Sequence, residues 1–205
     1  MYAAGKSGQL YTLNARTGQA TKVGTSAGAV GTAVGFDFNP TVDRIRLVTE
    51  SGRNLRLHPD TGAIAGVDTD LTYASGSKPR VAASAYTDSF AGATSTGLYG
   101  LDAAKDTLVT QGSLPGRTPV VSPNTGQLFT VGYLGRDISA VNGFDIEGRG
   151  SSSYDARDYT AIAAVRTSGL LAGSKLVKVD LRTGRTSPLL ALGLGDVVGL
   201  TFAAR

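Results

Sequence analysis

The chain has 205 residues, enough for one good hydrophobic core or two small ones, and 41% of them are apolar, which argues against a disordered chain. Its formal charge of +4 is mild, no block of five like charges occurs, and aromatic residues do not alternate with basic ones, so we expect no nucleic-acid partner. The sequence lacks Cys, which excludes disulfides and Cys-ligated zinc, and no apolar run approaches the roughly 18 residues of a membrane span.

Glycine is the compositional outlier, with 28 residues spread along the chain. Many of them stand at turn-like positions, such as Thr17-Gly18, Thr61-Gly62 and Thr183-Gly184. Gly adopts positive φ without the steric penalty of a Cβ atom. This distribution therefore predicts many short strands joined by tight turns, and an all-β fold.

A strand–turn–strand unit recurs along the chain. Its first copy joins the predicted strand Leu10–Leu13 to a second strand, Gln19–Val23, through Asn14-Ala15-Arg16-Thr17-Gly18. An Asp or Asn followed by Thr-Gly between two apolar runs is typical of a β-hairpin. The strands of the later copies contain Leu55, Leu98, Phe144 and Leu176, at successive spacings of 45, 43, 46 and 32 residues.

Further apolar segments between these hairpins are predicted to be inner strands. They are Val34–Phe38, Val81–Thr87, Thr118–Ser122, Thr160–Val165 and Val197–Phe202. Four antiparallel strands in each unit of about 40 residues make the blade of a β-propeller. The sequence thus predicts a single small β-propeller domain over residues 1–205, with about five four-stranded blades. We expect Met1–Thr12 and Val197–Ala203 to share one blade and close the ring.

Several of these segments carry a family resemblance. They are the run from Val34 to Val48, Asn54-Leu55-Arg56-Leu57 with Asp60-Thr61-Gly62, and the run from Ala85 to Thr94. The sequence here resembles the DUF4394 domain, a family of uncharacterised bacterial proteins. The resemblance covers most of residues 1–112, is looser over residues 113–172 and returns at residues 173–205. It implies a propeller-like β architecture, often in exported proteins, and implies no activity or catalytic residue.

Neither a catalytic set nor a metal site is predicted. His58 is the single histidine, so a Ser-His-Asp triad would have to use it, and its place at a hairpin favours a solvated turn residue. Asp37, Asn39 and Asp43 have the alternating oxygen ligands of a calcium loop, but the terminal Glu and Gly are missing. We interpret them as turn residues, and we predict no cofactor.

The predicted connections between blades form a loop face that is rich in Arg and Lys. Arg binds phosphate and carboxylate groups through paired hydrogen bonds, so this face predicts a site for an anionic ligand. The candidate ligand-binding residues are Tyr73, Lys78, Arg80, Arg117, Tyr133, Arg136 and Arg166.

We therefore expect a monomeric, non-enzymatic binding module whose partner is an anionic small molecule, a polysaccharide or another protein. One alternative is a metal-dependent hydrolase or lyase with Glu50, Asp68, Asp137 and Asp196 at the channel mouth. A second alternative is a structural module of an envelope or surface layer. The start Met1-Tyr2-Ala3-Ala4 has no features of a leader. The protein is then periplasmic, on the cell surface or secreted if a leader was removed, and cytoplasmic otherwise.

Overall fold

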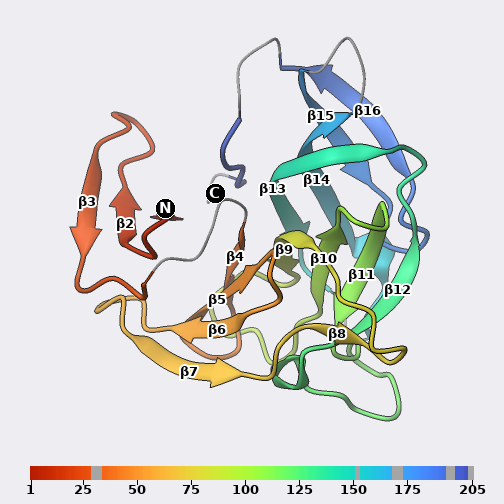
Figure 1. The fold of residues 1–205 in the computed structure, drawn as a ribbon, viewed down its shortest axis with the longest axis horizontal. Coiled ribbons are helices and arrows are strands. Elements are labelled where there is room, and N and C mark those ends of the chain that lie inside the picture. Colours follow the sequence, from red (N-terminus) through yellow and green to blue (C-terminus); the bar gives the residue numbers. More distant parts are fainter. Residues whose placement is uncertain (29–33, 151–152, 168–172, 193–196, 203–205) are drawn as a thin grey trace.

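The fold is all-β and consists of four small sheets arranged as a four-bladed β-propeller that is not closed (Figure 1). It is seen in a computed structural model, which describes residues 1–28, 34–150, 153–167, 173–192 and 197–202. The helices found in these ranges are two single turns of 3₁₀ helix, η1 (Pro123–Thr125) and η2 (Ala156–Asp158). None of the described helices is long and apolar enough to cross a membrane.

The first half of the chain forms two antiparallel sheets. Sheet A consists of β1 (Tyr2–Ala4), β2 (Leu10–Leu13) and β3 (Ala20–Val23) in that order. Sheet B consists of β4 (Val34–Asn39), β5 (Arg44–Thr49), β6 (Asn54–Leu57) and β7 (Ile64–Asp68). Both sheets are simple meanders, because short turns join each strand to its neighbour.

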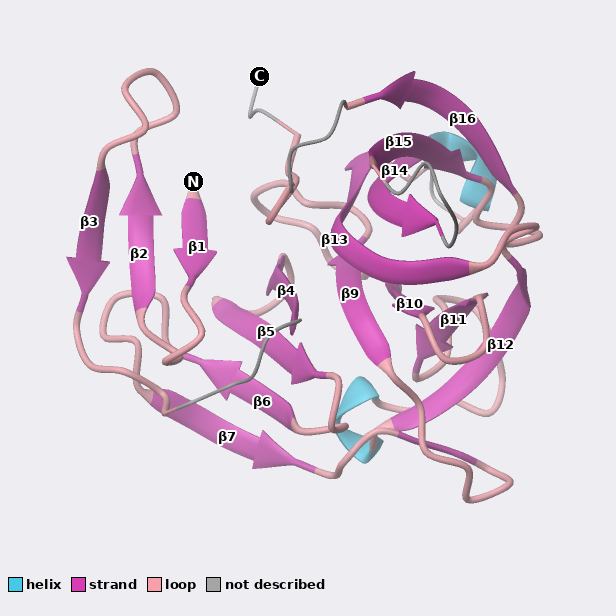
Figure 2. Ribbon diagram, turned by 45° about the horizontal axis from the view of Figure 1, so that its top comes forward, coloured by secondary structure: helices cyan, strands magenta, loops and turns pink. Residues whose placement is uncertain are grey.

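The second half forms two larger sheets (Figure 2). Sheet C has the order β8 (Thr72–Tyr73), β12 (Gln127–Tyr133), β11 (Thr107–Gln111), β10 (Leu98–Asp102) and β9 (Val81–Tyr86), with β8 parallel to β12. Sheet D consists of β13 (Ile138–Gly148), β14 (Tyr159–Thr167), β15 (Ser174–Val179) and β16 (Thr186–Ala191).

Apolar side chains fill the spaces between neighbouring sheets. One cluster joins sheets A and B around Leu10 and Leu47, and a second joins sheets B and C around Val48 and Val109. The largest cluster joins sheets C and D, and includes Ala83 and Phe144. Every residue of β9 is buried, since its Ala side chains let the inner strands on both sides approach closely.

The inner strands of sheets B and D share a Gly-Phe-Asp motif that ties each of them to the next segment. On β4, Asp37 accepts hydrogen bonds from the N–H of Phe38 (2.7 Å) and from the N–H of Tyr86 on β9 (2.6 Å). A Cβ atom at Gly35 would lie 2.4 Å from Ser84 Oγ, so glycine is required where β4 and β9 meet.

Asp145 makes the equivalent bonds on β13. It accepts from the N–H of Ile146 (2.8 Å), the N–H of Phe202 (2.6 Å) and the hydroxyl of Thr201 (2.8 Å). A Cβ atom at Gly143 would lie 2.5 Å from the backbone N of Leu200. Residues 197–202 are therefore fixed beside β13, just as β9 is fixed beside β4.

A buried cation adds a second tie between sheets B and C. Arg46 is 2% exposed, and its guanidinium donates to Asn54 Oδ1 (2.6 Å) and Asp68 Oδ2 (2.8 Å) within sheet B. It also donates to Tyr86 Oη (3.1 Å) and to Asn124 Oδ1 (2.7 Å) from sheet C and η1. Since each guanidinium nitrogen has a partner and Asp68 supplies a negative charge, the charge is compensated inside the protein.

The prediction of five blades is wrong, because two predicted inner strands have other positions. Thr118–Ser122 lies in the connection between β11 and β12, where Val120 is 86% exposed. Pro119 and Pro123 have no N–H to give to a sheet at this point. Thr160–Val165 belongs to β14, the second strand of sheet D, so the spacing of 32 residues from Phe144 to Leu176 lies within one sheet.

The predicted closing blade is also not formed. β1 pairs with β2 alone, and residues 197–202 form no strand, while Ala203 lies outside the described residues. The bonds to Asp145 hold Thr201 and Phe202 on the sheet D side of the gap between sheets A and D (Figure 1). The ring is consequently open at this point.

Candidate functional site

A pocket of about 650 Å³ lies where sheets C and D meet, and we call it the Arg117 pocket. Three connections supply its walls: the one after β9, the one between β11 and β12, and the one between β13 and β14. Its lining residues are Asp88, Phe90, Thr94, Ser95, Pro115, Gly116, Arg117, Gly150, Ser153, Tyr154 and Tyr159. Loops held by rigid strands are a common place for ligand sites.

Asp88 fixes two of these walls to each other. It has a positive φ of 57° and is 6% exposed, an uncommon conformation that Asp tolerates better than most residues. Its carboxylate accepts from the N–H of Gly150 (2.7 Å), the hydroxyl of Tyr159 (2.7 Å) and the hydroxyl of Thr87 (3.1 Å). The buried charge is thus satisfied by three donors, and the connections after β9 and β13 are held together.

Tyr154 and Tyr159 continue the wall, and Tyr99 of β10 supports it. The rings of Tyr154 and Tyr159 stack with their centroids 5.6 Å apart, and the hydroxyls of Tyr99 and Tyr154 share a hydrogen bond. Burial raises the pKa of Tyr99 to about 12 and also raises the pKa values of Tyr154 and Tyr159. All three phenols therefore stay protonated at neutral pH, and they stabilise the pocket as hydrogen-bonding groups and not as bases.

Arg117 is the exposed cation of the pocket. It follows Gly116, whose φ of 77° shapes the turn, and its N–H donates to the carbonyl of Leu114 (3.2 Å). No ion pair of Arg117 is found among the described residues, although Asp88 lines the same pocket. The guanidinium is accordingly available to an anionic group that enters from solvent.

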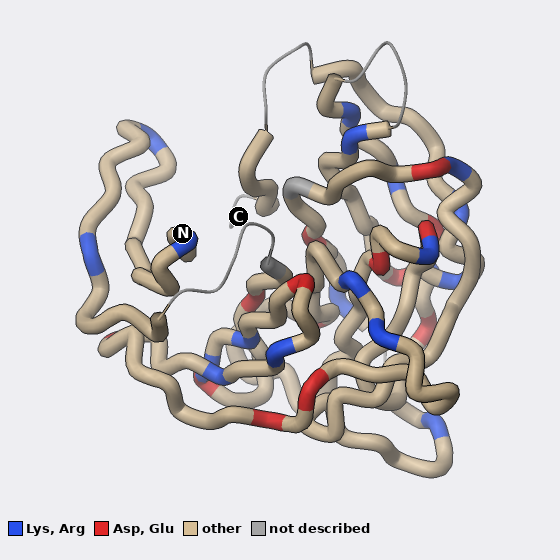
Figure 3. The backbone as a smooth tube through the Cα atoms, viewed as in Figure 1, with Lys and Arg blue, Asp and Glu red and all other residues tan. Residues whose placement is uncertain are grey.

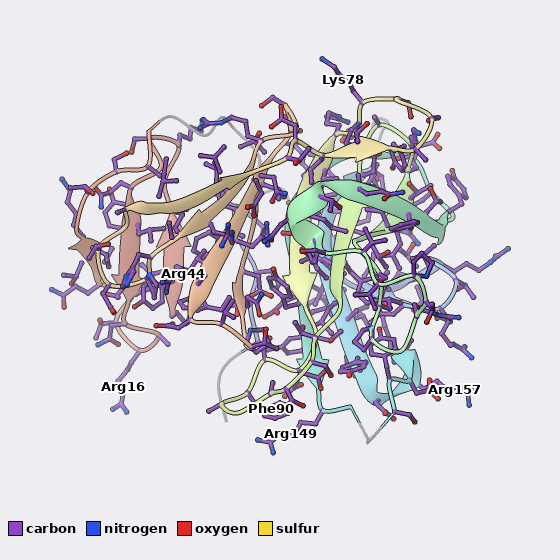
Figure 4. All side chains as sticks on the ribbon, turned by 90° about the horizontal axis from the view of Figure 1, so that it is seen from below. Arg16, Arg44, Lys78, Phe90, Arg149 and Arg157 are labelled. Atoms are coloured by element: carbon purple, nitrogen blue, oxygen red, sulfur yellow. The ribbon has the colours of Figure 1, made fainter. Side chains whose placement is uncertain are left out.

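The candidate residues Tyr73, Lys78 and Arg80 lie elsewhere, near the turn between β10 and β11. Tyr73 is 7% exposed and donates its hydroxyl to Asp102 (2.6 Å). Arg80 donates to Glu50 (3.4 Å) and to the carbonyl oxygen of Ala103 (2.9 Å). The β10–β11 turn precedes β11, whereas Arg117 comes after the other end of this strand. Figure 4 shows exposed Lys78 on the opposite side of the molecule from the pocket residue Phe90.

The other three candidates lie towards sheet D. Tyr133 is exposed and donates to Asp137 (3.0 Å), and Arg136 donates to the hydroxyl of Thr186 (2.7 Å). Arg166 is half-buried near the end of β14. The candidates thus do not converge on one basic face, and Figure 3 shows basic and acidic residues interspersed along the chain. Whether any of them binds a ligand stays a prediction.

Four carboxylates are the proposed ligands of the metal-dependent alternative, and the three that the structure describes have separate partners. Glu50 pairs with Arg80. Asp68 pairs with Arg46 and Arg56 at 2.8 Å each, and Asp137 accepts from Tyr133. Asp196 lies outside the described residues. In the described part of the chain, no group of three or more acidic, His or Cys side chains is placed to hold a metal ion.

The interpretation of Asp37 as a turn residue is wrong, because Asp37 lies within β4 and accepts from the N–H of Tyr86 on β9. Asn39 Oδ1 accepts from the N–H and the hydroxyl of Thr41 (2.9 and 2.7 Å), next to the β4–β5 turn. His58 lies before the hairpin turn that follows β6, where its ring accepts from the N–H of Asp60 (3.3 Å). The contacts of Asn39 and His58 are those of turn residues.

Sequence reasoning found Arg117 as a candidate but missed Asp88, Tyr154 and Tyr159. A polar Thr87-Asp88-Ser89 directly after an apolar strand was the one signal available for Asp88. The partners of all three residues come from distant parts of the chain, 62 residues away for the bond between Asp88 and Gly150. Such a site can be recognised only from the three-dimensional structure.

The fold and the site together define the class: an open, four-bladed β-propeller-like domain with a polar pocket between two blades. The chain belongs to the DUF4394 family, a domain of unknown function, which matches residues 1–201. The sequence resemblance is thereby confirmed. A comparison with curated proteins gave no match.

Proposed function

We propose that the domain is a non-enzymatic binding module that holds an anionic ligand in the Arg117 pocket. The observation that carries this proposal is the combination of a fixed wall with one exposed cation. Asp88 and the tyrosines are locked by their own hydrogen bonds, whereas Arg117 faces solvent without an ion pair in the described structure. The ligand bears a carboxylate or phosphate group, as in an acidic sugar.

The chemistry of the wall supports binding more than catalysis. Asp88 accepts three hydrogen bonds from groups of the protein, which suits a structural role in the wall better than the role of a base. The phenols of Tyr154 and Tyr159 are protonated at neutral pH, as a tyrosine ordinarily is, and burial raises their pKa values still further from it. The single histidine lies on sheet B and does not line the pocket.

The size of the pocket suits a small ligand. A volume of about 650 Å³ falls within the range of about 300–1,000 Å³ that is usual for small-molecule sites. Thr94 and Ser95 line it together with Arg117, and their hydroxyls are of the kind that bonds to the hydroxyls of a sugar. With the Asp88 carboxylate bonded to other groups of the wall, Arg117 would distinguish a charged sugar from its neutral counterpart.

The test compares D-glucuronate with D-glucose, two ligands that differ in one carboxylate. We expect glucuronate to raise the melting temperature in a concentration-dependent way and glucose to raise it much less. Arg117→Gln should remove this difference, while Arg157→Gln should keep it. Arg157 is a suitable control because its side chain is 72% exposed, it does not line the pocket, and its removal changes the net charge equally.

Two results would contradict the proposal. One is the absence of a thermal shift with both glucuronate and inorganic phosphate. The other is an equal loss of the thermal shift in Arg117→Gln and Arg157→Gln. That result would mean that the shift depends on the overall charge of the protein and not on Arg117.

A further inference from the structure

A second pocket adjoins the Arg117 pocket, and the inference drawn from it rests on the proposed function. It has a volume of about 450 Å³ and lies between the β4–β5 turn of sheet B and the connection after β9. We call it the Pro40 pocket. The apolar residues Phe38, Pro40, Phe90 and Ala91 line it, together with polar residues that include Asp43.

Phe90 lines both pockets, so the two cavities share this residue as part of their walls. The guanidinium of Arg149 lies over the ring, 4.2 Å from its centroid, and the two side chains are next to each other in Figure 4. Arg149 precedes Gly150, which lines the Arg117 pocket. Half-buried Phe90 is therefore an apolar residue common to both pockets, with one basic side chain stacked on its ring.

The charge at the other end is of opposite sign. Asp43 is exposed, and its carboxylate has no ion pair in the described part of the chain. The neighbouring Arg44 directs its guanidinium to the main-chain oxygen of Asp43 instead. The Pro40 pocket thus contains an acid and the Arg117 pocket a cation, and Phe90 lines both pockets.

We propose that the two pockets form one site for a short peptide with free ends. Its terminal carboxylate binds Arg117, an apolar side chain packs against Phe90 and Pro40, and its terminal ammonium binds Asp43. A fatty acid fits less well, because its tail would lie beside the Asp43 carboxylate and leave that charge uncompensated. A neutral sugar chain would use neither of the two charges.

The experiment measures the affinity of the peptide alanyl-leucyl-alanyl-leucine by calorimetry, in free, C-amidated and N-acetylated forms. The wild-type protein should bind the free peptide about fivefold more tightly than either blocked form, as expected for partly exposed ion pairs of about 1 kcal/mol. Arg117→Gln should abolish the discrimination against the amide. Asp43→Asn should abolish the discrimination against the acetylated peptide, and Phe90→Ala should weaken all three complexes.

The outcomes separate this inference from the proposed function. If the amide binds less tightly but acetylation and Asp43→Asn have no effect, the peptide inference is overturned and the anion site remains. If the wild-type protein binds the C-amidated peptide as tightly as the free peptide, or does not bind the free peptide at all, the peptide inference fails. The glucuronate test then decides on the anion site alone. Since the blocked peptides are tested on the wild-type protein, the result does not depend on whether the Phe90 variant folds.

Discussion

Replacing Asp37 with Asn should remove much of the pH dependence that this carboxyl gives to the stability of the domain. Asp37 joins β4 to β9, and burial of the carboxyl raises its pKa from 3.8 to about 8. The charge of Asp145 raises the pKa further, while the N–H groups of Tyr86 and Phe38 oppose the shift. An Asn side chain has nearly the same shape and stays neutral at every pH.

The sign and size of the effect follow from proton linkage. The native carboxyl holds its proton more tightly than the unfolded one, so its contribution is fully present below pH 3.8 and is lost as the pH rises toward 8. One proton changes the free energy of unfolding by about 1.4 kcal/mol per pH unit. Between pH 4 and pH 7 the loss is about 4 kcal/mol, an upper value because Asp37 is not fully buried and keeps some contact with water.

The assay is urea denaturation of the wild-type and Asp37→Asn proteins at several pH values from 4 to 8. The variant loses one backbone hydrogen bond, worth about 1 kcal/mol, at every pH. Between pH 4 and pH 7 its free energy of unfolding should nevertheless rise by about 2–4 kcal/mol relative to that of the wild type. Asp43→Asn, which changes an exposed carboxylate of the adjacent turn, is the control. Parallel curves for the wild type and Asp37→Asn would refute the reasoning.

Two further substitutions test the ties between sheets. Asp145→Ala removes the acceptor of the Phe202 N–H, so hydrogen exchange of that amide should accelerate by about tenfold or more; unchanged protection would show that residues 197–202 are not held by Asp145. Arg46→Met takes from the Asp68 carboxylate, whose side chain is 6% exposed, one of its two arginine partners and takes one donor from buried Asn54, so it should lower the free energy of unfolding by about 3–5 kcal/mol in urea titrations. Arg56→Met is its control, because that side chain is 33% exposed and should cost about 1 kcal/mol; equal losses would contradict the role given to Arg46.

The sequence predicts local hairpins well, because their signals are local. β4, β5 and β6 fall where alternating apolar residues and the Asp60-Thr61-Gly62 turn place strands. The number of blades depends on the position of each strand within its sheet, which these local signals do not reveal. Phe144 belongs to an inner strand and Leu98 to a second strand, and the hairpin pattern alone does not distinguish these two positions.

For the candidate site, too, residue types can be read from the sequence, whereas their tertiary contacts cannot. Arg117 is found from its residue type and its place in a connection. Arg80 and Tyr73 have equally suitable side chains, but ion pairing with Glu50 and hydrogen bonding to Asp102 engage them. Asp88 is missed because its role depends on Gly150 and Tyr159, whose approach is a property of the packing between sheets C and D. Tertiary partners, which the sequence does not display, decide which polar groups remain available.

The most direct test of the anion site is to observe the Arg117 guanidinium itself during a titration. In a protein labelled with ¹⁵N, the side-chain Nε–H signal of Arg117 should shift saturably as glucuronate is added, and should not shift with glucose. The signal of Arg157 should stay in place in both titrations, because that residue does not line the pocket. Equal, non-saturating shifts of the two signals, or no shift of Arg117 at any glucuronate concentration, would contradict a binding site in the Arg117 pocket.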